Sequence, residues 1–420
     1  MRLNYLSLTN FRNYTRLELR LPGRLTLVRG ANAQGKTNLL EAIHLLATGR
    51  SPRALAEREL INWLALESPL PYARLAGEIG EGAEAEKLEL VLESVASPVA
   101  GNGPIVRKQV RVNGAPKRAL DLVGRLRVVL FLPEDISLVA GVPAQRRRYL
   151  DIALCQISPA YCRALSEYNR VISQRNALLK RLREHGGDAR QLAFWNARAA
   201  EQGGQIIYKR VQAIAMLHDI AARRHLDLTR GEQLRLAYLP GASLEPEGTL
   251  RNGLADASQA ANRVLAGGPR LRDRLSSYLA MTPEVVADRF LAALQAAQER
   301  EIAAGTSLLG PHRDDMSFAV DGQDLRTFGS RGQQRTAALA LKLAEMEMMQ
   351  KETGSSPLLL LDDVMSELDE QRRETVLAAL DTVAQAVVTT TDLSDFGPAL
   401  LRETCNLQLT AGVLAPMLVE

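Results

Sequence analysis

Positions 30 to 37 of the chain read Gly30-Ala31-Asn32-Ala33-Gln34-Gly35-Lys36-Thr37. They form a complete G-x-x-x-x-G-K-[ST] phosphate-binding pattern between an apolar run at 25–28 and a helix-like segment at 38–43. The pattern requires this strand–loop–helix context, because glycines let successive backbone N–H groups face phosphate oxygens and the helix adds its positive N-terminal end. The chain is therefore predicted to bind a nucleoside triphosphate; the alternative is a flexible glycine turn.

The chemistry of this pattern gives its residues separate roles. Gly30 and Gly35 are expected to let the backbone turn. Lys36 is expected to reach the β- and γ-phosphates of ATP, and Thr37 to ligate Mg²⁺. The predicted nucleotide-binding residues here are Gly30, Ala31, Asn32, Ala33, Gln34, Gly35, Lys36, Thr37 and Asn38.

A second part of the predicted site follows an apolar run much later in the chain. Residues 357–361 read Pro-Leu-Leu-Leu-Leu, which is typical of a buried strand, and Asp362 and Asp363 come directly after it. In ATPases with this phosphate loop, the strand-end Asp holds Mg²⁺ and the next acidic residue polarises the attacking water. Lys36, Asp362 and Asp363 are therefore the predicted catalytic residues. The alternative is a strand that simply exits to solvent.

The composition is that of a folded protein of two or three domains. Of the 420 residues 46% are hydrophobic, but only 4% are aromatic, which disfavours large stacking platforms for single-stranded nucleic acid. No apolar run reaches the roughly 18 residues that span a membrane, and residues 1–5 lack a signal-peptide pattern. Cys155 and Cys162, seven positions apart, are predicted to be buried thiols on one helix face. The few cysteines fit a reducing cytoplasm.

Positive charge is concentrated in the middle of the chain. Residues 125–230 contain 16 Arg and 2 Lys against 9 Asp and Glu, a net charge of +9. Because the whole chain carries +4, the remaining residues sum to −5. A basic middle favours a polyanionic partner, either nucleic acid or anionic lipid. The alternative is that these charges are simply solvated on Arg-rich helices.

Hydrophobic periodicity predicts an α/β fold interrupted by a helical insertion. Strands are expected at 3–9, 17–21, 25–28, 87–92, 108–112, 316–320, 357–361 and 386–390, with turns at 112–115 and 321–322 and a turn-rich stretch at 231–250. Helices are expected at 160–183, 194–225, 257–265, 269–279, 283–304, 333–351 and 369–380. No sustained heptads occur, so the insertion is expected to be compact rather than a coiled-coil arm. The predicted parts are 1–135 (ATPase), 136–305 (mainly helical insertion) and 306–420 (ATPase).

Residues 330–334 read Ser-Arg-Gly-Gln-Gln before a helix rich in Ala and Leu. Ser330 and Gln333 have the spacing of a capping box, and a capped helix end with a free glycine backbone can also bind phosphate. Because the segment lies about thirty residues before a Leu-rich strand ending in Asp-Asp, it resembles the Ser-x-Gly-Gln signature of ABC-type ATPases. The resemblance implies that Ser330, Gly332 and Gln333 face the γ-phosphate of ATP bound to a partner subunit.

Two further segments resemble loops of the same class. Residues 366–369, Ser-Glu-Leu-Asp, match the loop that crosses the dimer interface, which implies a role for Asp369 in the shared site. Residues 389–392, Thr-Thr-Thr-Asp, follow a predicted strand where the class places a γ-phosphate sensor, commonly a His. No His is present here. Thr391 is the expected nucleotide-binding residue, and which of Thr389 to Thr391 senses the γ-phosphate stays open.

More than three hundred residues separate Thr37 from Asp362, over twice the spacing of transporter-type ATPase subunits. This gap and the Asn-Phe-Arg at 10–12 are similar to the SMC-like branch of the class, which implies that Arg12 contacts the nucleotide.

Longer motifs resemble the RecF family of bacterial recombination-repair ATPases. Residues 133–151 match its Pro-Glu-Asp…Gly-x-Pro-x-x-Arg-Arg-x-aromatic-Leu-Asp motif, and residues 310–315, Gly-Pro-His-Arg-Asp-Asp, match a second one. Residues 39–51 and 366–369 match others. The resemblance runs from Asn10 to about Thr391, and Val142 departs from it where a small residue is expected.

The resemblance implies an ABC-type P-loop ATPase head with a helical insertion, using ATP and Mg²⁺ in the cytoplasm, at the nucleoid. It implies an ATP-dependent homodimer that binds double-stranded and gapped DNA and, with RecR and RecO, helps load RecA during DNA repair and replication-fork maintenance. Asp363 is one methylene shorter than the class's usual glutamate, so slow hydrolysis is expected. The resemblance implies a weak ATPase that DNA stimulates. Arginines of the basic middle and Arg50 or Arg53 are expected to contact DNA. Another SMC-like ATPase, a transporter-type subunit and a purely structural DNA-binding protein are the alternatives.

Overall fold

The computed structural model describes residues 2–96, 104–229, 231–242 and 277–417. It divides into two compact units, Met1–Glu134 with Met349–Glu420, and Asp135–Met348. The phosphate loop and Asp362 belong to the first unit, and Ser330 belongs to the second. The predicted helix at 257–265 and most of the one at 269–279 lie outside the described residues, and the predicted three-part division stays a prediction.

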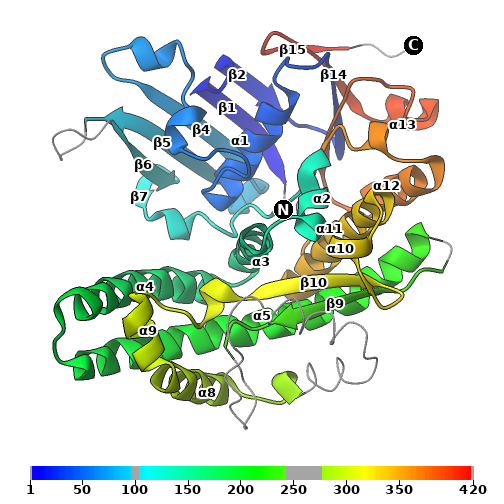
Figure 1. Ribbon diagram of the computed structural model, residues 1–420. Coiled ribbons are helices and arrows are strands. Elements are labelled where there is room, and N and C mark those ends of the chain that lie inside the picture. The colour runs from blue at the N-terminus through cyan, green and yellow to red at the C-terminus, as the bar shows by residue number, and fades with distance from the viewer. Residues whose placement is uncertain (1, 97–103, 230, 243–276, 418–420) are drawn as a thin grey trace. The chain divides into compact units, whose positions relative to one another are not determined.

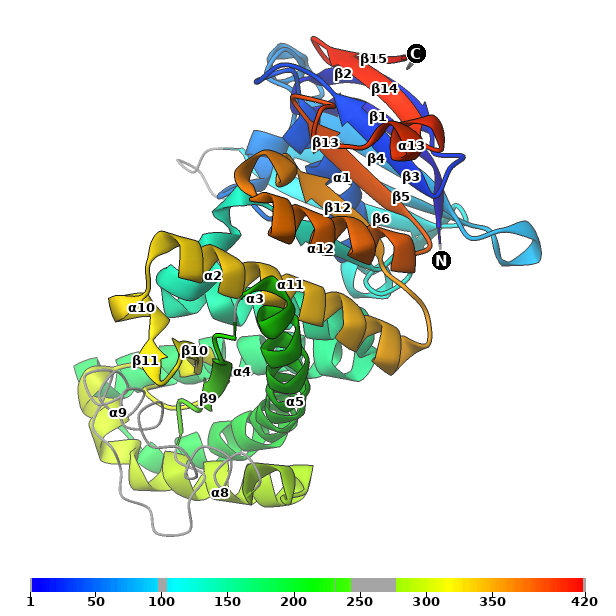
Figure 2. The ribbon, with the colours of Figure 1, turned by 90° about the vertical axis from the view of Figure 1, so that its right-hand side faces the viewer.

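The first unit contains two sheets, each six-stranded within the described residues, which flank helix α1 (Figures 1 and 2). One is antiparallel with the order β2-β1-β4-β5-β6-β7. The other has the order β15-β14-β3-β13-β12-β8 and is parallel from β14 to β8. The strands are Leu3–Phe11 (β1), Tyr14–Arg20 (β2), Leu25–Arg29 (β3), Tyr72–Ile79 (β4), Glu86–Val95 (β5), Ile105–Val112 (β6), Ala115–Lys117 (β7), Val128–Phe131 (β8), Leu358–Asp362 (β12), Ala386–Thr390 (β13), Cys405–Thr410 (β14) and Val413–Pro416 (β15).

The residues of the candidate site lie at one edge of the parallel sheet. All residues of β12 and β13 are buried, as expected for parallel strands that are covered on both faces. Strand β13 pairs with β3 on one side and with β12 on the other. Because parallel strands end at the same edge of a sheet, the loop after β3, the acidic end of β12 and the threonines that end β13 meet there.

Helix α1 (Lys36–Thr48) is the centre of the first unit. It contacts strands of both sheets, and nearly all of its residues are buried. It ends at Gly49, whose N–H bonds to the Leu45 carbonyl oxygen in a left-handed C-cap. The other helices of this unit are Glu370–Thr382 (α12) and Pro398–Arg402 (α13).

The second unit consists of helices and a small antiparallel sheet with the order β11-β10-β9. The long helices α4 and α5 pack against each other, and α8 packs against α5. The strands are Leu234–Leu239 (β9), Asp315–Val320 (β10) and Gln323–Asp324 (β11). The helices are Ile136–Ala140 (α2), Pro143–Ile157 (α3), Pro159–His185 (α4), Leu192–Leu228 (α5), Pro283–Ala296 (α8), Gln298–Ala304 (α9), Leu325–Phe328 (α10) and Arg331–Thr353 (α11), the last of which continues into the first unit.

The structure corrects several local predictions. Cys155 and Cys162 are buried, but they belong to α3 and α4, because Ser158 caps a new helix that starts with Pro159. The helix predicted at 283–304 is broken at Ala297 into α8 and α9. The turn-rich stretch at 231–250 contains β9, which pairs with β10 inside the second unit.

Several strands were not predicted, among them β14 and β15 near the end of the chain and β4 and β8 in its first part. β8 has only 4 residues, and β4 contains Ala and Gly, which disfavour strands. Over the described ranges, no helix is both long and apolar enough to cross a membrane.

Candidate nucleotide-binding site

The phosphate loop joins β3 to α1 and contains two glycines that its packing requires. Gly35 has φ +111°, and a Cβ on it would lie 2.4 Å from the Asn13 amide nitrogen. A Cβ on Gly30 would lie 2.8 Å from the carbonyl oxygen of Leu409 in β14. Gly30 therefore permits the close approach of β14. Of the two glycines that were predicted to let the backbone turn, only Gly35 has a positive φ; Ala33, with φ 65°, is the other such residue of the loop.

Side chains from the turn between β1 and β2 hold the phosphate loop. The Asn13 amide nitrogen donates to the Gln34 carbonyl oxygen at 3.0 Å, and its Oδ1 accepts from Asn38 Nδ2 at 2.8 Å. The Tyr14 hydroxyl donates to the Gly35 carbonyl oxygen at 2.9 Å. Sequence reasoning missed this support, because an Asn-Tyr pair in a hairpin turn carries no signal for nucleotide binding.

The first turn of α1 is open to an anion. Its N-cap is Gly35, no side chain caps the turn, and the turn contains no acidic residue. Its N–H groups and the positive end of the helix dipole are thus available for phosphate. Lys36 is buried, and its Nζ donates to the Gly30 carbonyl oxygen at 2.5 Å. Burial lowers the pKa of Lys36, and the carboxylates of Asp363 and Asp362 oppose that shift.

Asp362 ends β12 and accepts a hydroxyl group on each of its carboxylate oxygens. Thr37 Oγ1 donates to Oδ2 at 2.6 Å, and Thr389 Oγ1 donates to Oδ1 at 2.7 Å. Asp362 is only 5% exposed, and burial raises its pKa against the lowering effect of these two hydrogen bonds. The structure thus brings Thr37 and Asp362 together across 325 positions, and it adds Thr389, whose contact with Asp362 the sequence did not predict.

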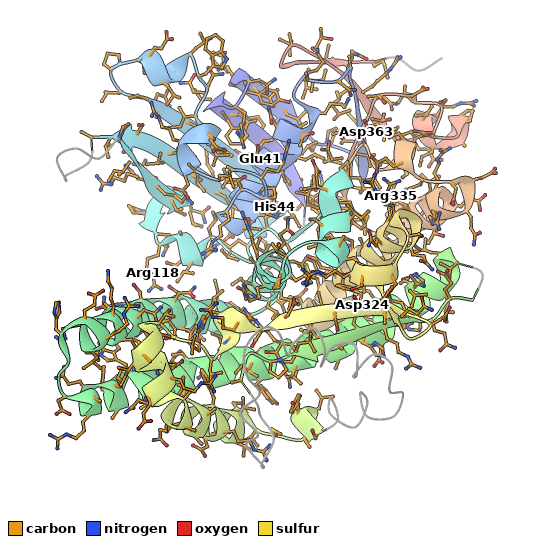
Figure 3. All side chains as sticks on the ribbon, in the orientation of Figure 1. Glu41, His44, Arg118, Asp324, Arg335 and Asp363 are labelled. Atoms are coloured by element: carbon orange, nitrogen blue, oxygen red, sulfur yellow. The ribbon has the colours of Figure 1, made fainter. Side chains whose placement is uncertain are left out.

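Asp363 lies beside this pair in a strained backbone conformation (Figure 3). Its φ is 51°, and a left-handed non-glycine residue costs about 1–3 kcal/mol, so it persists only where the surrounding structure holds it. The Asp363 N–H donates to the Thr389 carbonyl oxygen at 3.1 Å. Its carboxylate Oδ1 accepts from the Thr391 N–H at 3.4 Å. The predicted residue Thr391 therefore reaches the acidic pair through its backbone.

Arg12 contacts a carboxylate inside the protein. Its Nε and Nη2 donate to the two oxygens of Glu41, both at 2.9 Å, and its Nη1 donates to the Glu59 carbonyl oxygen at 2.9 Å. Glu41 is fully buried on α1 (Figure 3) and also accepts from Ser51 Oγ. The bidentate pair ties the turn between β1 and β2 to α1, and the contacts of Ser51 with Glu41 and of Glu59 with Arg12 attach the segment at 51–59 to this pair. A contact between Arg12 and the nucleotide stays a prediction.

The oxygen atoms at Thr37 and Asp362 fit Mg²⁺. A hydroxyl oxygen and a carboxylate oxygen 2.6 Å apart are hard ligands, and Mg²⁺ commonly completes its shell with water and phosphate oxygens. Among the residues that the structure describes, no group of three or more His, Cys, Asp or Glu could hold a metal ion. Mg²⁺ bound at Thr37 and Asp362 would take its remaining ligands from water and from the phosphates of the nucleotide.

Two other predicted residues cap helices. Gln333 N donates to Ser330 Oγ at 3.2 Å and Ser330 N donates to Gln333 Oε1 at 3.1 Å, which confirms the capping box at α11. Ser330 and Gly332 are exposed. In the first unit, Asp369 accepts from the Arg372 N–H at 3.0 Å and caps α12. Contacts of these residues with a nucleotide stay predictions.

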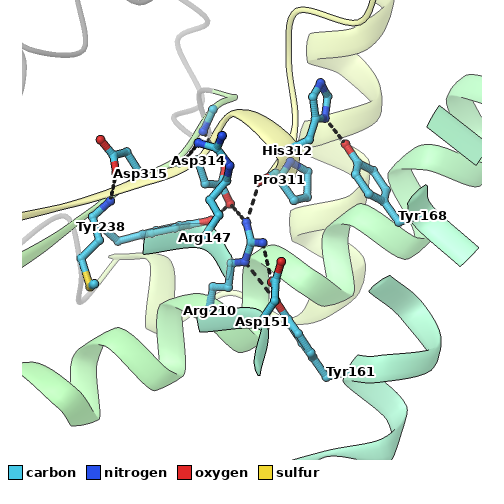
Figure 4. A network of polar contacts seen from close by, with 12 residues as sticks. Arg147, Asp151, Tyr161, Tyr168, Arg210, Tyr238, Pro311, His312, Asp314 and Asp315 are labelled. Carbon is cyan, nitrogen blue, oxygen red and sulfur yellow. Dashed lines mark hydrogen bonds and ion pairs between the residues drawn. The ribbon is translucent and has the colours of Figure 1, made fainter. Parts of the chain in front are cut away.

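The two long motifs near 133–151 and 310–315 contribute to a buried ionic network in the second unit (Figure 4). Arg210 of α5 joins them: its guanidinium lies 2.7 Å from a carboxylate oxygen of Asp151 and 2.7 Å from one of Asp314. Arg210 also donates to the Pro311 carbonyl oxygen at 2.6 Å and to the Tyr161 hydroxyl at 3.0 Å. Burial alone would lower the pKa of Arg210, and the surrounding Tyr161, Asp151 and Asp314 raise it above its ordinary value.

Buried ion pairs reduce the positive charge that residues 125–230 can present at the surface. Arg146, Arg175 and Arg210, three of the 16 arginines in this stretch, are buried and paired with carboxylates. Their charge is neutralised inside the fold, so the excess of +9 overstates the positive charge at the surface. Contacts with a polyanion are therefore left to the other basic side chains of this stretch.

Comparison with known proteins identifies the family. The sequence model of the RecF/RecN/SMC N terminal domain matches residues 2–399. A Chloroflexus aurantiacus protein, "DNA replication and repair protein RecF", is 41% identical over 413 residues, which cover 96% of each chain. The chain belongs to the RecF family. A RecF protein of Herpetosiphon aurantiacus is 40% identical over 426 residues, covering 99% of this chain and 100% of that one.

Solved RecF structures share the architecture. The structure of the recombination mediator protein RecF with ATP, from the RecFOR pathway, has a TM-score of 0.79 and 30% identity and covers 99% of this chain and 97% of that chain. The RecF membership confirms the predicted fold, an ABC-type ATPase head with a helical insertion, and the described residues contain no long coiled coil.

Proposed function

We propose that this RecF family member binds ATP with Mg²⁺ on its phosphate loop and hydrolyses it. The observation that carries the proposal is the 2.6 Å hydrogen bond between Thr37 and Asp362, beside the uncapped first turn of α1. Backbone N–H groups of 31–38 bind the phosphates, whereas the Gly30 N–H donates to the Thr390 carbonyl oxygen, and Lys36 reaches the β- and γ-phosphates. Thr37 and Asp362 hold Mg²⁺, which when bound neutralises charge on these phosphates.

Asp363 is the proposed group that orients the attacking water. Its side chain is one methylene shorter than glutamate, and its Oδ1 accepts from the backbone N–H of Thr391. The carboxylate is therefore held close to the main chain, which supports slow hydrolysis. Stimulation of that hydrolysis by DNA is part of the proposal by analogy with the family. In this proposal bound ATP mainly keeps the protein on DNA, and slow hydrolysis ends that binding.

The ATP site is proposed to be completed by a second copy of the chain. Ser330 and Gly332 are exposed at the start of α11, whose first turn presents backbone N–H groups. In the dimer, Ser330, Gly332, Gln333 and Asp369 of one protomer would contact ATP that is bound by its partner. ATP would then favour the dimer by mass action, because it binds both surfaces at once.

Replacing Ser330 by alanine is expected to weaken ATP-dependent dimerisation by about 10- to 100-fold for each shared ATP site, since a hydrogen bond to a charged group contributes about 1.5–3 kcal/mol. Gel filtration with and without ATP, then with gapped DNA, measures this. Ser158→Ala is the matched control, because Ser158 also caps a helix of the second unit and either change removes an N-cap worth about 1 kcal/mol. A wild-type protein that stays monomeric with ATP and DNA would count against the proposed dimer.

The proposed cellular role is recombinational DNA repair and replication-fork maintenance in the cytoplasm. Two findings support it: the relatives are named DNA replication and repair protein RecF, and the similar solved structure is that of a recombination mediator protein in the RecFOR pathway. In this role the protein would bind double-stranded and gapped DNA and, together with RecR and RecO, assist the loading of RecA on single-stranded gaps. Exposed Arg50 and Arg53 and the surface arginines of the basic middle would contact DNA phosphates.

Arg163 and Arg170 give a direct test of DNA binding. They are exposed on α4 and, seven positions apart, share one face of that helix. If both contact phosphates, the double variant Arg163→Ala/Arg170→Ala should reduce the slope of log K against log salt by about 2. Fluorescence anisotropy with gapped duplex DNA at several salt concentrations measures it, with Arg16→Ala, an exposed arginine of β2, as the control. Wild-type binding that does not depend on salt would contradict the proposed phosphate contacts.

A further inference from the structure

Thr389 is a buried polar residue where an apolar one would suffice. It is 1% exposed in β13, between β3 and β12. In a parallel strand that is covered on both faces, valine fills the same volume without a polar atom to satisfy. Thr26, in the neighbouring strand β3, is buried with no hydrogen-bond partner for its hydroxyl. Thr389 differs, because its hydroxyl has partners on both acidic residues of the site.

The hydroxyl group of Thr389 has one proton and three neighbours. Its Oγ1 lies 2.7 Å from Asp362 Oδ1 and 3.3 Å from the Leu361 carbonyl oxygen, and it accepts from the Asp363 N–H at 3.2 Å. The proton goes to the carboxylate, because the charged acceptor is nearer and forms the stronger bond. Thr389 therefore donates to the side chain of Asp362 and accepts from the backbone of Asp363.

These contacts fix the direction of the Asp362 carboxylate. Thr389 binds Oδ1, which leaves Oδ2 directed at Thr37 Oγ1, 2.6 Å away. Without the Thr389 hydroxyl the carboxylate could rotate about its last side-chain bond, whose torsional preference is broad. The Asp363 N–H keeps a second acceptor, the Thr389 carbonyl oxygen at 3.1 Å, so the loss would fall on Asp362.

We infer that Thr389 is a positioning residue: its hydroxyl holds the Asp362 carboxylate toward Thr37 and so prepares the pair that binds Mg²⁺ with the nucleotide. The inference rests on the proposed function of that pair. It gives Thr389 a role that differs from sensing the γ-phosphate, since its hydroxyl is directed at a carboxylate. Groups that orient a metal ligand in this way typically change metal affinity about 10–100-fold when they are removed.

The test compares Thr389→Val, which removes the hydroxyl, with Thr389→Ser, which keeps it. Thr26→Val is the matched control, because it makes the same change at a buried site of the same sheet without touching an acid. Binding of ATP is measured by calorimetry in EDTA and during titration with Mg²⁺, and thermal melting checks the fold. Thr389→Val should bind ATP normally in EDTA and need about tenfold more Mg²⁺. Thr389→Ser and Thr26→Val should match the wild type.

The possible outcomes separate this inference from the proposed function. If the wild type shows no Mg²⁺-dependent binding of ATP, both are overturned. If the wild type responds to Mg²⁺ and Thr389→Val behaves like Thr26→Val, only the role of Thr389 is overturned. Should Thr389→Val melt at a clearly lower temperature, Thr389→Ala takes its place. A Thr389→Ala variant that retains the wild-type requirement for Mg²⁺ equally rejects the inference.

Discussion

Replacing Arg210 by methionine is expected to lower the free energy of unfolding by about 3–5 kcal/mol, the typical cost of breaking a buried ion pair by removing one partner. The guanidinium is 1% exposed and neutralises Asp314, which is itself 1% exposed, as well as Asp151. Methionine fills much of the space but leaves the Asp314 carboxylate buried without its cation. It also removes the donor for the Pro311 carbonyl oxygen.

Chemical denaturation monitored by circular dichroism measures the Arg210 effect. Arg190→Met is the matched control, because Arg190 belongs to the same unit, pairs with Asp188 and is 91% exposed at its side chain. An exposed pair contributes about 0–1 kcal/mol, so this control should stay close to the wild type. Equal stability of the two variants would show that the buried network does not hold the second unit together.

The Lys36→Arg variant is expected to bind ATP but to hydrolyse it about 100-fold more slowly, the usual scale for losing one group that stabilises transition-state charge. Lys36 is 6% exposed, and its compact ammonium group lies between the Gly30 carbonyl oxygen at 2.5 Å and the Ala31 carbonyl oxygen at 3.3 Å. The larger planar guanidinium keeps the charge but cannot take the same position. Binding should therefore persist while catalysis is lost.

A phosphate-release assay with gapped DNA measures turnover of Lys36→Arg, and calorimetry measures ATP binding. Lys87→Arg is the control, since Lys87 is exposed in β5 and the change is chemically the same. Undiminished hydrolysis by Lys36→Arg would remove Lys36 from the proposed catalytic residues. Loss of ATP binding along with hydrolysis would instead indicate that the wider side chain blocks the loop.

Some parts of the fold and site were predictable because their chemistry is local. A phosphate loop needs glycine, lysine and threonine at fixed spacing, and the Leu-rich strand at 357–361 needs only its own apolar side chains to indicate burial. The capping box of Ser330 and Gln333 also lies within four residues, and the structure confirms it. These patterns can be recognised in the sequence without knowing any contact between distant residues.

Other parts could not be predicted, because their partners are far apart in the chain. Nothing near Arg210 distinguishes it from other arginines of α5; its partners Asp151 and Asp314 are 59 and 104 positions away. Glycine is needed at position 30 because β14 packs closely against it. The strand at 315–320 pairs with β9, and its own sequence pattern does not specify that partner. The roles of these residues follow from strand order and helix packing.

The sequence by itself determined a phosphate loop, an acidic strand end and the RecF-type order of motifs, because each depends on residues that are neighbours along the chain. Only the tertiary structure decided how these parts meet. The pairing of β13 with both β3 and β12 brings the Thr389 hydroxyl to Asp362 and, on the other carboxylate oxygen, Asp362 to Thr37. The physical reason is that strand order and register, which depend on how segments far apart in the chain pack together, set which polar ends lie within hydrogen-bond distance.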